Sequence, residues 1–238
     1  MNTPLILLPG MMCDERLFAP QRDAITDRTV TVAAIDGADR VADLARAVLA
    51  EAPPRFALGG LSMGGIVAME MAAQAPERIA GLCLMDTNSE AEAAAIANRR
   101  VPQMARVAAG ELRAVMRDEM KPNYLAEGPR RAAMLDLCMA MAEALGPEAF
   151  LRQSWALMTR ADRQDALRAM AVPSLVLCGA EDTLCPVHRH ERMAGLLPDA
   201  VLEIVPGAGH LPTLERPEAV NTALAAWLSR VDTEEAGR

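Results

Sequence analysis

Aromatic side chains and long apolar runs are scarce in this sequence. Only 3 % of its 238 residues are Phe, Trp or Tyr, so a pocket built for stacking flat rings is not favoured. No apolar run approaches the ~20 residues that cross a membrane as a helix. An apolar strand begins almost at the first residue, without a basic stretch before it, and we therefore expect no signal peptide.

Positive charge and cysteine are also limited. The net charge is −8, and without clustered basic residues to neutralise phosphates we expect no nucleic-acid partner. The five cysteines are odd in number and show no metal-binding spacing, which argues against a disulfide framework and fits a reducing, cytoplasmic setting. We expect neither a metal nor another cofactor.

One glycine-rich turn stands out against this background. Gly60, Ser62 and Gly64 form a Gly-x-Ser-x-Gly pattern, which follows the apolar run 55–58 and precedes the helix-type run 66–74. A strand that turns abruptly into a helix crowds its corner, and small residues two positions before and after the corner relieve that crowding. The pattern predicts that Ser62 is a nucleophile at a helix amino terminus, where negative charge is stabilised.

Histidine offers few candidates for a general base because the chain has only three. His210 ends the glycine loop 206–209 that follows the apolar run 200–205, a position where open α/β sheets place functional groups. His188 and His190 fall in the first turn of what we expect to be an exposed helix. Two residues apart they point to different faces, which disfavours a metal site. His210 is therefore the predicted base.

The carboxylate that would orient His210 has three candidates. Asp182 stands just past the apolar run 173–178, and an aspartate there can accept the Nδ1 proton of the histidine. Glu181 is its neighbour, and Asp86 ends another apolar run at the same sheet edge. We favour Asp182 and keep Asp86 as the serious alternative.

Two kinds of segment divide the chain. Apolar runs predict a mostly parallel, doubly wound α/β sheet of about six strands, near 4–8, 30–35, 55–58, 81–85, 173–178 and 200–205. Residues 88–165 have helical spacing with breaks at Pro102 and at glycine–proline positions, and predict about four inserted helices. We expect a core of 1–87 and 166–238, a helical cap of 88–165, and a last helix that ends at Arg230.

Several segments, taken in this order, resemble the α/β-hydrolase superfamily over nearly the whole chain. They are Leu7 to Met12, the turn around Ser62, Val172 to Asp182, and Gly207 to His210. The order of nucleophile, acid and base along the chain is also that of this superfamily. The resemblance implies an α/β-hydrolase fold without the usual first hairpin, with Ser62 as nucleophile, His210 as general base and Asp182 as its orienting acid.

The resemblance also implies an oxyanion hole. Its donors would be the backbone N–H groups of Met11 and Met63, which hold the negative oxygen of the reaction intermediate. Members of the superfamily commonly carry His-Gly after the first strand, where this chain has Pro9 and Gly10. That difference leaves the three side chains in place and alters the loop that carries Met11.

Such an arrangement is typical of a serine hydrolase that cleaves carboxylic esters of short or medium acyl chains through an acyl-enzyme intermediate. The turn and the helical insertion are similar to those of pimeloyl-acyl-carrier-protein methyl ester esterases, which implies acyl carrier protein as a partner besides a small-molecule ester. That partner is acidic and needs a basic surface, for which the candidates are Arg99, Arg100, Arg106, Arg113, Arg117, Arg130 and Arg131. Lactonases and C–C bond hydrolases use the same triad, and a non-catalytic ligand receptor is the remaining alternative.

The inserted segment is also rich in methionine, which is flexible and polarizable. Such side chains either line an adaptable apolar pocket for an acyl group or form the interior of the cap. They are Met104, Met116, Met120, Met134, Met139, Met141 and Met158.

Overall fold

The computed structural model describes residues 2–237 and contains one sheet of six strands, all parallel, in the order β2-β1-β3-β4-β5-β6. Each predicted strand is found, within a few residues of its expected bounds. The strands are β1 (Leu5–Leu8), β2 (Val30–Val32), β3 (Phe56–Leu61), β4 (Ile79–Met85), β5 (Ser174–Gly179) and β6 (Ala200–Val205). The sequence prediction of a mostly parallel α/β sheet is therefore confirmed.

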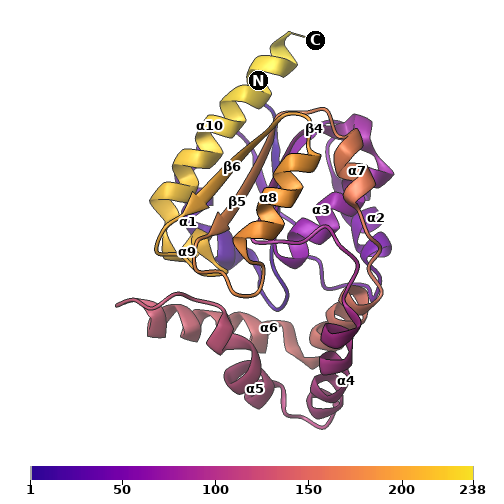
Figure 1. Cartoon of the computed structure of the whole chain (residues 1–238), viewed down its shortest axis with the longest axis vertical. Coiled ribbons are helices and arrows are strands. Elements are labelled where there is room, and N and C mark those ends of the chain that lie inside the picture. The colour runs from indigo at the N-terminus through magenta and orange to yellow at the C-terminus, as the bar shows by residue number, and fades with distance from the viewer. Residues whose placement is uncertain (1, 238) are drawn as a thin grey trace.

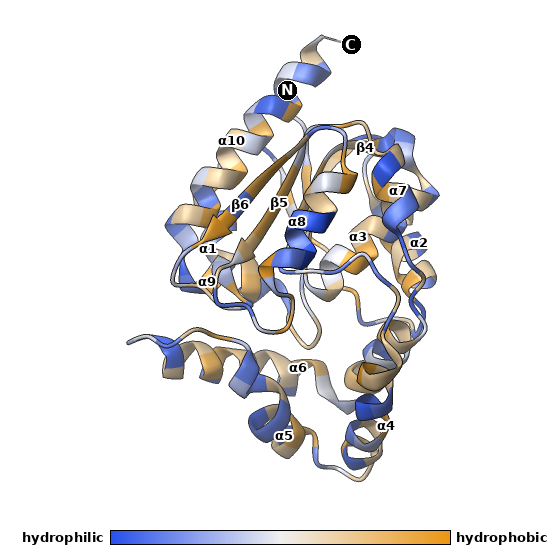
Figure 2. Cartoon of the chain, in the orientation of Figure 1, coloured by the Kyte–Doolittle hydropathy of each residue, from blue (hydrophilic) through white to orange (hydrophobic). Residues whose placement is uncertain are grey.

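Burial explains why these runs form strands. Every residue of β1, β3, β4 and β5 is buried, as expected when helices cover both faces of a parallel sheet. The edge strands β2 and β6 are half exposed. Figure 2 shows β5 and β6 mostly in orange, whereas the ribbon of the neighbouring helix α8 (Val187–Leu196) is partly blue. The apolar strands thus form the centre of the core.

Helices cover the sheet on both faces (Figure 1). Helix α3 packs on β1, β3 and β4, α8 packs on β5 and β6, and α2 and α7 lie against α3. Helix α10 packs on β4, β5 and β6 from the other side, together with α1. The bounds are α1 (Ala19–Ala24), α2 (Val41–Glu51), α3 (Met63–Gln74), α7 (Gln164–Ala169) and α10 (Pro217–Ala236), with short helical turns at Glu15–Phe18, Pro76–Arg78 and α9 (Pro212–Glu215).

The last helix is longer than the sequence indicated. We expected it to end at Arg230, but α10 continues to Ala236. Val231 is fully buried, and Asp232 forms an ion pair of 2.9 Å with Arg28, whose side chain is itself buried. These contacts join the end of the chain to its first residues and extend the helix.

The inserted helices lie beyond the carboxyl ends of the strands (Figure 1). They are α4 (Ala94–Ala108), α5 (Leu112–Val115), a π-helical turn (Met116–Met120), a 3₁₀ turn (Lys121–Asn123) and α6 (Arg131–Met158). Pro102 was expected to break a helix, but it lies inside α4. Gly146 interrupts α6 with φ of 79°, a left-handed conformation that glycine adopts without steric cost. Within residues 2–237, no helix is long and apolar enough to span a bilayer.

The strand order places a ligand site between β1 and β3. The chain leaves β1 for the outer strand β2 and then returns to the other side of β1 to form β3. In open parallel sheets, ligands bind where the order reverses, at the carboxyl ends of the strands. Leu8 pairs with Gly60 across these two strands, so the loop that starts at Pro9 and the turn around Ser62 begin side by side.

Candidate active site

Ser62 occupies a sharp turn between β3 and α3. Its backbone has φ of 55° and ψ of −115°, a strained conformation for a residue with a side chain. A Cβ at Gly60 would lie 2.3 Å from the carbonyl oxygen of Gly64, and one at Gly64 would lie 2.0 Å from that of Leu8. Only glycine fits at either position, so the motif is required by close backbone contact around Ser62.

The structure brings Ser62, His210 and Asp182 into one hydrogen-bonded chain. The Nε2 atom of His210 lies 2.9 Å from the Oγ of Ser62, and its Nδ1 lies 2.8 Å from the Oδ2 of Asp182. The side chain of Asp182 is fully buried and that of His210 is 6 % exposed. Three strands separated along the chain therefore deliver these side chains to one edge of the sheet.

The surroundings of Asp182 favour its charged form. Burial alone would raise the pKa of this carboxyl, but the charge and hydrogen bond of His210 and two backbone N–H groups outweigh it, and the pKa lies below the usual range. Its Oδ1 accepts those N–H groups from Leu184 at 2.8 Å and Cys185 at 3.0 Å. A carboxylate only accepts hydrogen bonds, so Nδ1 of His210 carries the proton and Nε2 is left to accept the Ser62 hydroxyl.

Asp86, the alternative acid, has a different environment. It is fully buried at the end of β4 with φ of 44°, and its Oδ1 accepts the N–H of Gly179 at 2.9 Å. Its Oδ2 has no hydrogen-bond partner in the described structure. Burial, and then the negative charge of Asp182, raises the pKa of Asp86 well above the usual aspartate value. The surroundings of Asp86 therefore favour its uncharged form, and among residues 2–237 no hydrogen bond joins it to His210.

The raised pKa of Asp86 has a consequence for stability. Its pKa is higher in the folded than in the unfolded chain, so the folded state binds more protons and stability falls as pH rises above about 4. Asparagine does not titrate, so Asp86→Asn should not lose stability in this way. The free energy of unfolding of the variant, relative to that of the wild type, should therefore increase with pH, by at most about 1.4 kcal/mol per pH unit. Urea unfolding from pH 4 to 8 measures this. Asp39→Asn, at an exposed position, is the control, and an advantage independent of pH would mean that Asp86 is ionised.

Glu181 does not orient the histidine. It is exposed, and its Oε1 accepts the N–H of Gly207 at 3.2 Å. The described residues also place possible metal-binding atoms of Asp182, Cys185 and His210 within 4.8 Å of one another. Nδ1 of His210 and Oδ2 of Asp182 are already bonded together, however, and burial raises the pKa of the Cys185 thiol well above its usual value. This group of atoms therefore suits proton transfer better than a cation.

The two methionines expected to donate N–H groups are on the segments that follow β1 and β3. Met11 follows β1 and lines the space in front of Ser62, and Met63 is the first residue of α3. Neither N–H has a hydrogen-bond acceptor among residues 2–237. The next N–H, of Met12, donates to the Oε1 of the buried Gln153 at 2.9 Å. Gln153 on α6 thereby fixes the loop after β1. No sequence pattern predicted this role.

His190 is a second residue whose position differs from expectation. We expected an exposed histidine, but His190 is fully buried, and burial lowers its pKa to about 4. Its neutral Nε2 accepts the N–H of Thr87 at 3.0 Å, and the Oγ1 of Thr87 donates to the carbonyl of Ser62 at 2.7 Å. His190 and Thr87 thus stabilise the strained turn at Ser62 through two consecutive hydrogen bonds.

The loop that carries His210 is fixed by a buried carboxylate. Glu215, 3 % exposed, accepts the N–H groups of Gly209 at 2.9 Å, Leu211 at 3.1 Å and Ala126 at 2.8 Å. The N–H of His210 donates to the carbonyl of Tyr124 at 2.8 Å. Tyr124 and Ala126 belong to the inserted segment, so this segment and the histidine loop are joined by backbone hydrogen bonds.

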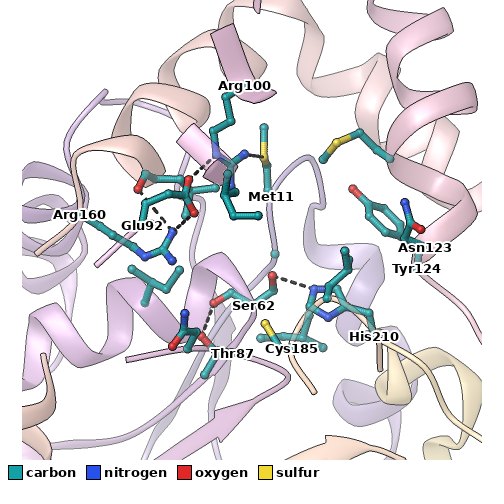
Figure 3. A pocket seen from close by; sticks show the side chains of 18 of the residues that line it. Met11, Ser62, Thr87, Glu92, Arg100, Asn123, Tyr124, Arg160, Cys185 and His210 are labelled. Atoms are coloured by element: carbon teal, nitrogen blue, oxygen red, sulfur yellow. Dashed lines mark hydrogen bonds and ion pairs between the residues drawn. The ribbon is translucent and has the colours of Figure 1, made fainter. Parts of the chain in front are cut away.

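A cavity of about 300 Å³ lies in front of Ser62, between the strand ends and the inserted helices (Figure 3). Core residues on its wall include Gly10, Met11, Ser62, Leu184 and His210, and inserted residues include Ile96, Arg100, Met120, Tyr124 and Leu157. Of the inserted methionines, Met120 is on the wall, whereas Met116, Met139 and Met141 are buried. Six of the seven inserted methionines are therefore not on the described wall of this cavity.

Comparison with known proteins agrees with the fold. A sequence model described as the alpha/beta hydrolase family matches residues 7–223. A Variovorax paradoxus (strain S110) protein named for carbamate hydrolysis, RutD, is 31 % identical over 209 residues, which are 84 % of this chain and 77 % of that protein. The pimeloyl-[acyl-carrier protein] methyl ester esterase of Pectobacterium carotovorum subsp. carotovorum (strain PC1) is 29 % identical over 200 residues, 80 % of this chain and 77 % of the esterase.

Among solved structures, a thermophilic esterase from Thermogutta terrifontis with malate bound is similar over almost the whole chain. The TM-score is 0.88 at 28 % sequence identity, and the match covers 98 % of this chain and 91 % of the esterase. The inserted helices are therefore included in the similarity.

Proposed function

Because this chain belongs to the α/β-hydrolase family, we propose that it is a serine esterase that cleaves carboxylic esters of short or medium acyl chains. The observation that carries the proposal is the hydrogen-bonded chain from Ser62 through His210 to Asp182, which ends at a cavity. The named relatives and the solved structure support hydrolysis as the reaction class.

In the proposed mechanism, Nε2 of His210 takes the proton of Ser62 as the Oγ attacks the ester carbonyl. The free N–H groups of Met11 and Met63 hold the oxyanion that forms, and each such donor contributes about 3 kcal/mol or more to transition-state stabilisation. His210 then passes the proton to the leaving alcohol, and the charge on Asp182 stabilises the imidazolium in between. Water, activated by His210, releases the acid from the acyl-enzyme intermediate.

We further propose that residues 88–165 form a cap over the site and limit the size of the substrate. About 300 Å³ is at the lower end of the range for ligand pockets, which favours a small ester. Apolar side chains from both parts of the chain, among them Met11, Ile96 and Leu157, offer a surface for a short acyl group.

Acyl carrier protein is a less favoured partner for this site. Of the arginines that could bind its acidic surface, Arg106 pairs with Glu111 and Glu119, Arg113 with Glu143, and Arg117 with Asp118. These pairs leave little unbalanced positive charge on the outside of the insertion. Lactone and C–C bond hydrolysis suit the same three side chains, and a ligand receptor would retain its ligand without turnover.

A fluorophosphonate probe tests the proposal directly. The probe should form one covalent adduct per chain, on Ser62, because among residues 2–237 only this serine is hydrogen-bonded to a histidine. Mass spectrometry of peptides identifies the labelled residue, and protein denatured before exposure is the control. A panel of p-nitrophenyl esters from acetate to octanoate should show turnover that declines with the longer chains. Absence of both labelling and turnover would contradict the proposal.

A further inference from the structure

One wall of the cavity is charged. Glu92, Arg100 and Arg160 stand opposite His210 and form a cluster on the same side of Ser62 as Met11 (Figure 3). The Oε2 of Glu92 accepts a hydrogen bond from the Nε of Arg100 at 2.5 Å, and its Oε1 accepts one from the Nη1 of Arg160 at 2.5 Å. The side chains of Glu92, Arg160 and Arg100 are 3 %, 7 % and 14 % exposed. Two guanidinium groups therefore share one carboxylate in a mostly buried position.

The hydrogen bonds of these arginines leave donors unused. Arg160 also donates through Nε to the carbonyl of Glu90 at 2.9 Å and through Nη1 to that of Leu157 at 3.4 Å. The Nη1 of Arg100 lies 3.6 Å from the sulfur of Met11, which is a weak hydrogen-bond acceptor. The Nη2 groups of both arginines have no acceptor in the part of the chain that is described. The structural role of the cluster is thus fulfilled by Nε and Nη1 alone.

The rest of the wall does not neutralise this cluster. Two other glutamates line the cavity, but Glu90 pairs with Arg192 and Glu119 with Arg106, and neither of these arginines is on the wall. Conversely, the wall residues Arg99 and Arg189 have no ion pair among residues 2–237. The cavity therefore carries excess positive charge in a chain whose net charge is −8.

From these contacts we propose that the cavity binds an ester that also carries a carboxylate, held by the Nη2 groups of Arg100 and Arg160. Each Nη2 group can donate to one oxygen of the same carboxylate, and such charge-assisted bonds are strongest where water is excluded. The cluster of two arginines and one glutamate lacks one negative charge, which a monocarboxylate supplies. This inference rests on the proposed esterase activity and adds the chemical class of its substrate.

The position of Arg100 also sets the distance between the two functional groups of the substrate. Arg100 contacts Met11, whose N–H is a proposed oxyanion donor, so the carboxylate lies a few bonds from the reacting carbonyl. A carboxylate of this kind belongs either to the acyl part, as in a half-ester of a dicarboxylic acid, or to the alcohol part, as in the acetyl ester of a hydroxy acid.

Kinetics on matched esters separates these outcomes. The acyl arm compares monomethyl adipate with methyl hexanoate, and the alcohol arm compares 4-acetoxybutanoate with butyl acetate. In one arm the wild type should show a kcat/KM at least about tenfold higher for the charged ester, and this ratio should fall as NaCl is raised, because salt screens the attraction. Arg100→Gln should lower the ratio by at least about tenfold. The readout is the ratio, so a general loss of activity cancels.

The control and the contradicting results are distinct. Arg113→Gln, which removes an exposed arginine that pairs with Glu143 away from the cavity, should keep the wild-type ratio. Equal or lower kcat/KM for the charged ester in both arms would overturn the inference and leave the esterase proposal intact. No hydrolysis of any of the four esters, with no labelling of Ser62, would instead reject the esterase proposal. The wild-type ratio and its salt dependence need no variant, so misfolding of Arg100→Gln would not obscure the answer.

Discussion

Ser62→Ala is expected to lower kcat for ester hydrolysis by at least about 10⁴-fold. The methyl group of alanine cannot form the acyl-enzyme bond, and the Nε2 of His210 loses the hydroxyl that it contacts at 2.9 Å. Hydrolysis by the variant would depend on direct attack of water on an ester held by the N–H groups of Met11 and Met63. Steady-state rates with p-nitrophenyl acetate measure the loss, and the fluorophosphonate probe should no longer bind.

The variant should fold normally, because it removes only the hydroxyl group, whose hydrogen-bond partner is His210. Circular dichroism and thermal unfolding check this. Ser229→Ala on the exposed face of α10 is a matched control and should keep full activity and full labelling. A Ser62→Ala protein with kcat within tenfold of the wild type would remove Ser62 from the mechanism, whatever the geometry around it.

Asp182→Asn should have the second-largest effect, a decrease in kcat of about 10⁴-fold. The Oδ2 of Asp182 accepts the Nδ1 proton of His210 at 2.8 Å, whereas an amide nitrogen at that position is a donor. The imidazole would then move its proton to Nε2 and could not accept the Ser62 proton. The Oδ1 of the asparagine could still accept the N–H groups of Leu184 and Cys185, so the loop itself should be preserved.

Asp86→Asn is the control that distinguishes the two buried aspartates. Asp86 has a raised pKa and accepts a hydrogen bond from Gly179 and none from His210, so its replacement by a neutral isostere should change kcat by less than about tenfold. The pair of variants therefore tests the assignment made from sequence. If Asp86→Asn lost activity by orders of magnitude while Asp182→Asn kept it, the orienting acid would be at the end of β4.

The sheet was predictable because its strands are buried on both faces. Such strands appear in the sequence as continuous apolar runs, and β4 and β5 are examples. The end of β3 was less visible, since we expected it near Leu58. The strand continues through Gly59 and Gly60 because β1 and β4 supply hydrogen-bonding partners on both sides. Glycine disfavours an isolated strand, but neighbours override this preference.

The three hydrogen-bonded side chains were found from sequence because each lies within a few residues of the end of a strand, and parallel strands end at one edge. The supporting residues had no such signal. Thr87, His190 and Glu215 act through hydrogen bonds to segments distant in sequence, as in the 103-residue separation of Thr87 from His190. The continuation of α10 past Arg230 likewise depends on contacts with the start of the chain. Tertiary partners of this kind cannot be read from local composition.

The attachment of the inserted segment to the histidine loop matters for any attempt to change specificity by exchanging this segment. The carbonyl of Tyr124 and the N–H of Ala126 are bonded to His210 and Glu215, respectively. A chimera that imports a foreign cap must reproduce these two backbone positions, or the imidazole shifts away from the serine. An exchange of the inserted segment made to change specificity would therefore also affect the position of the His210 imidazole.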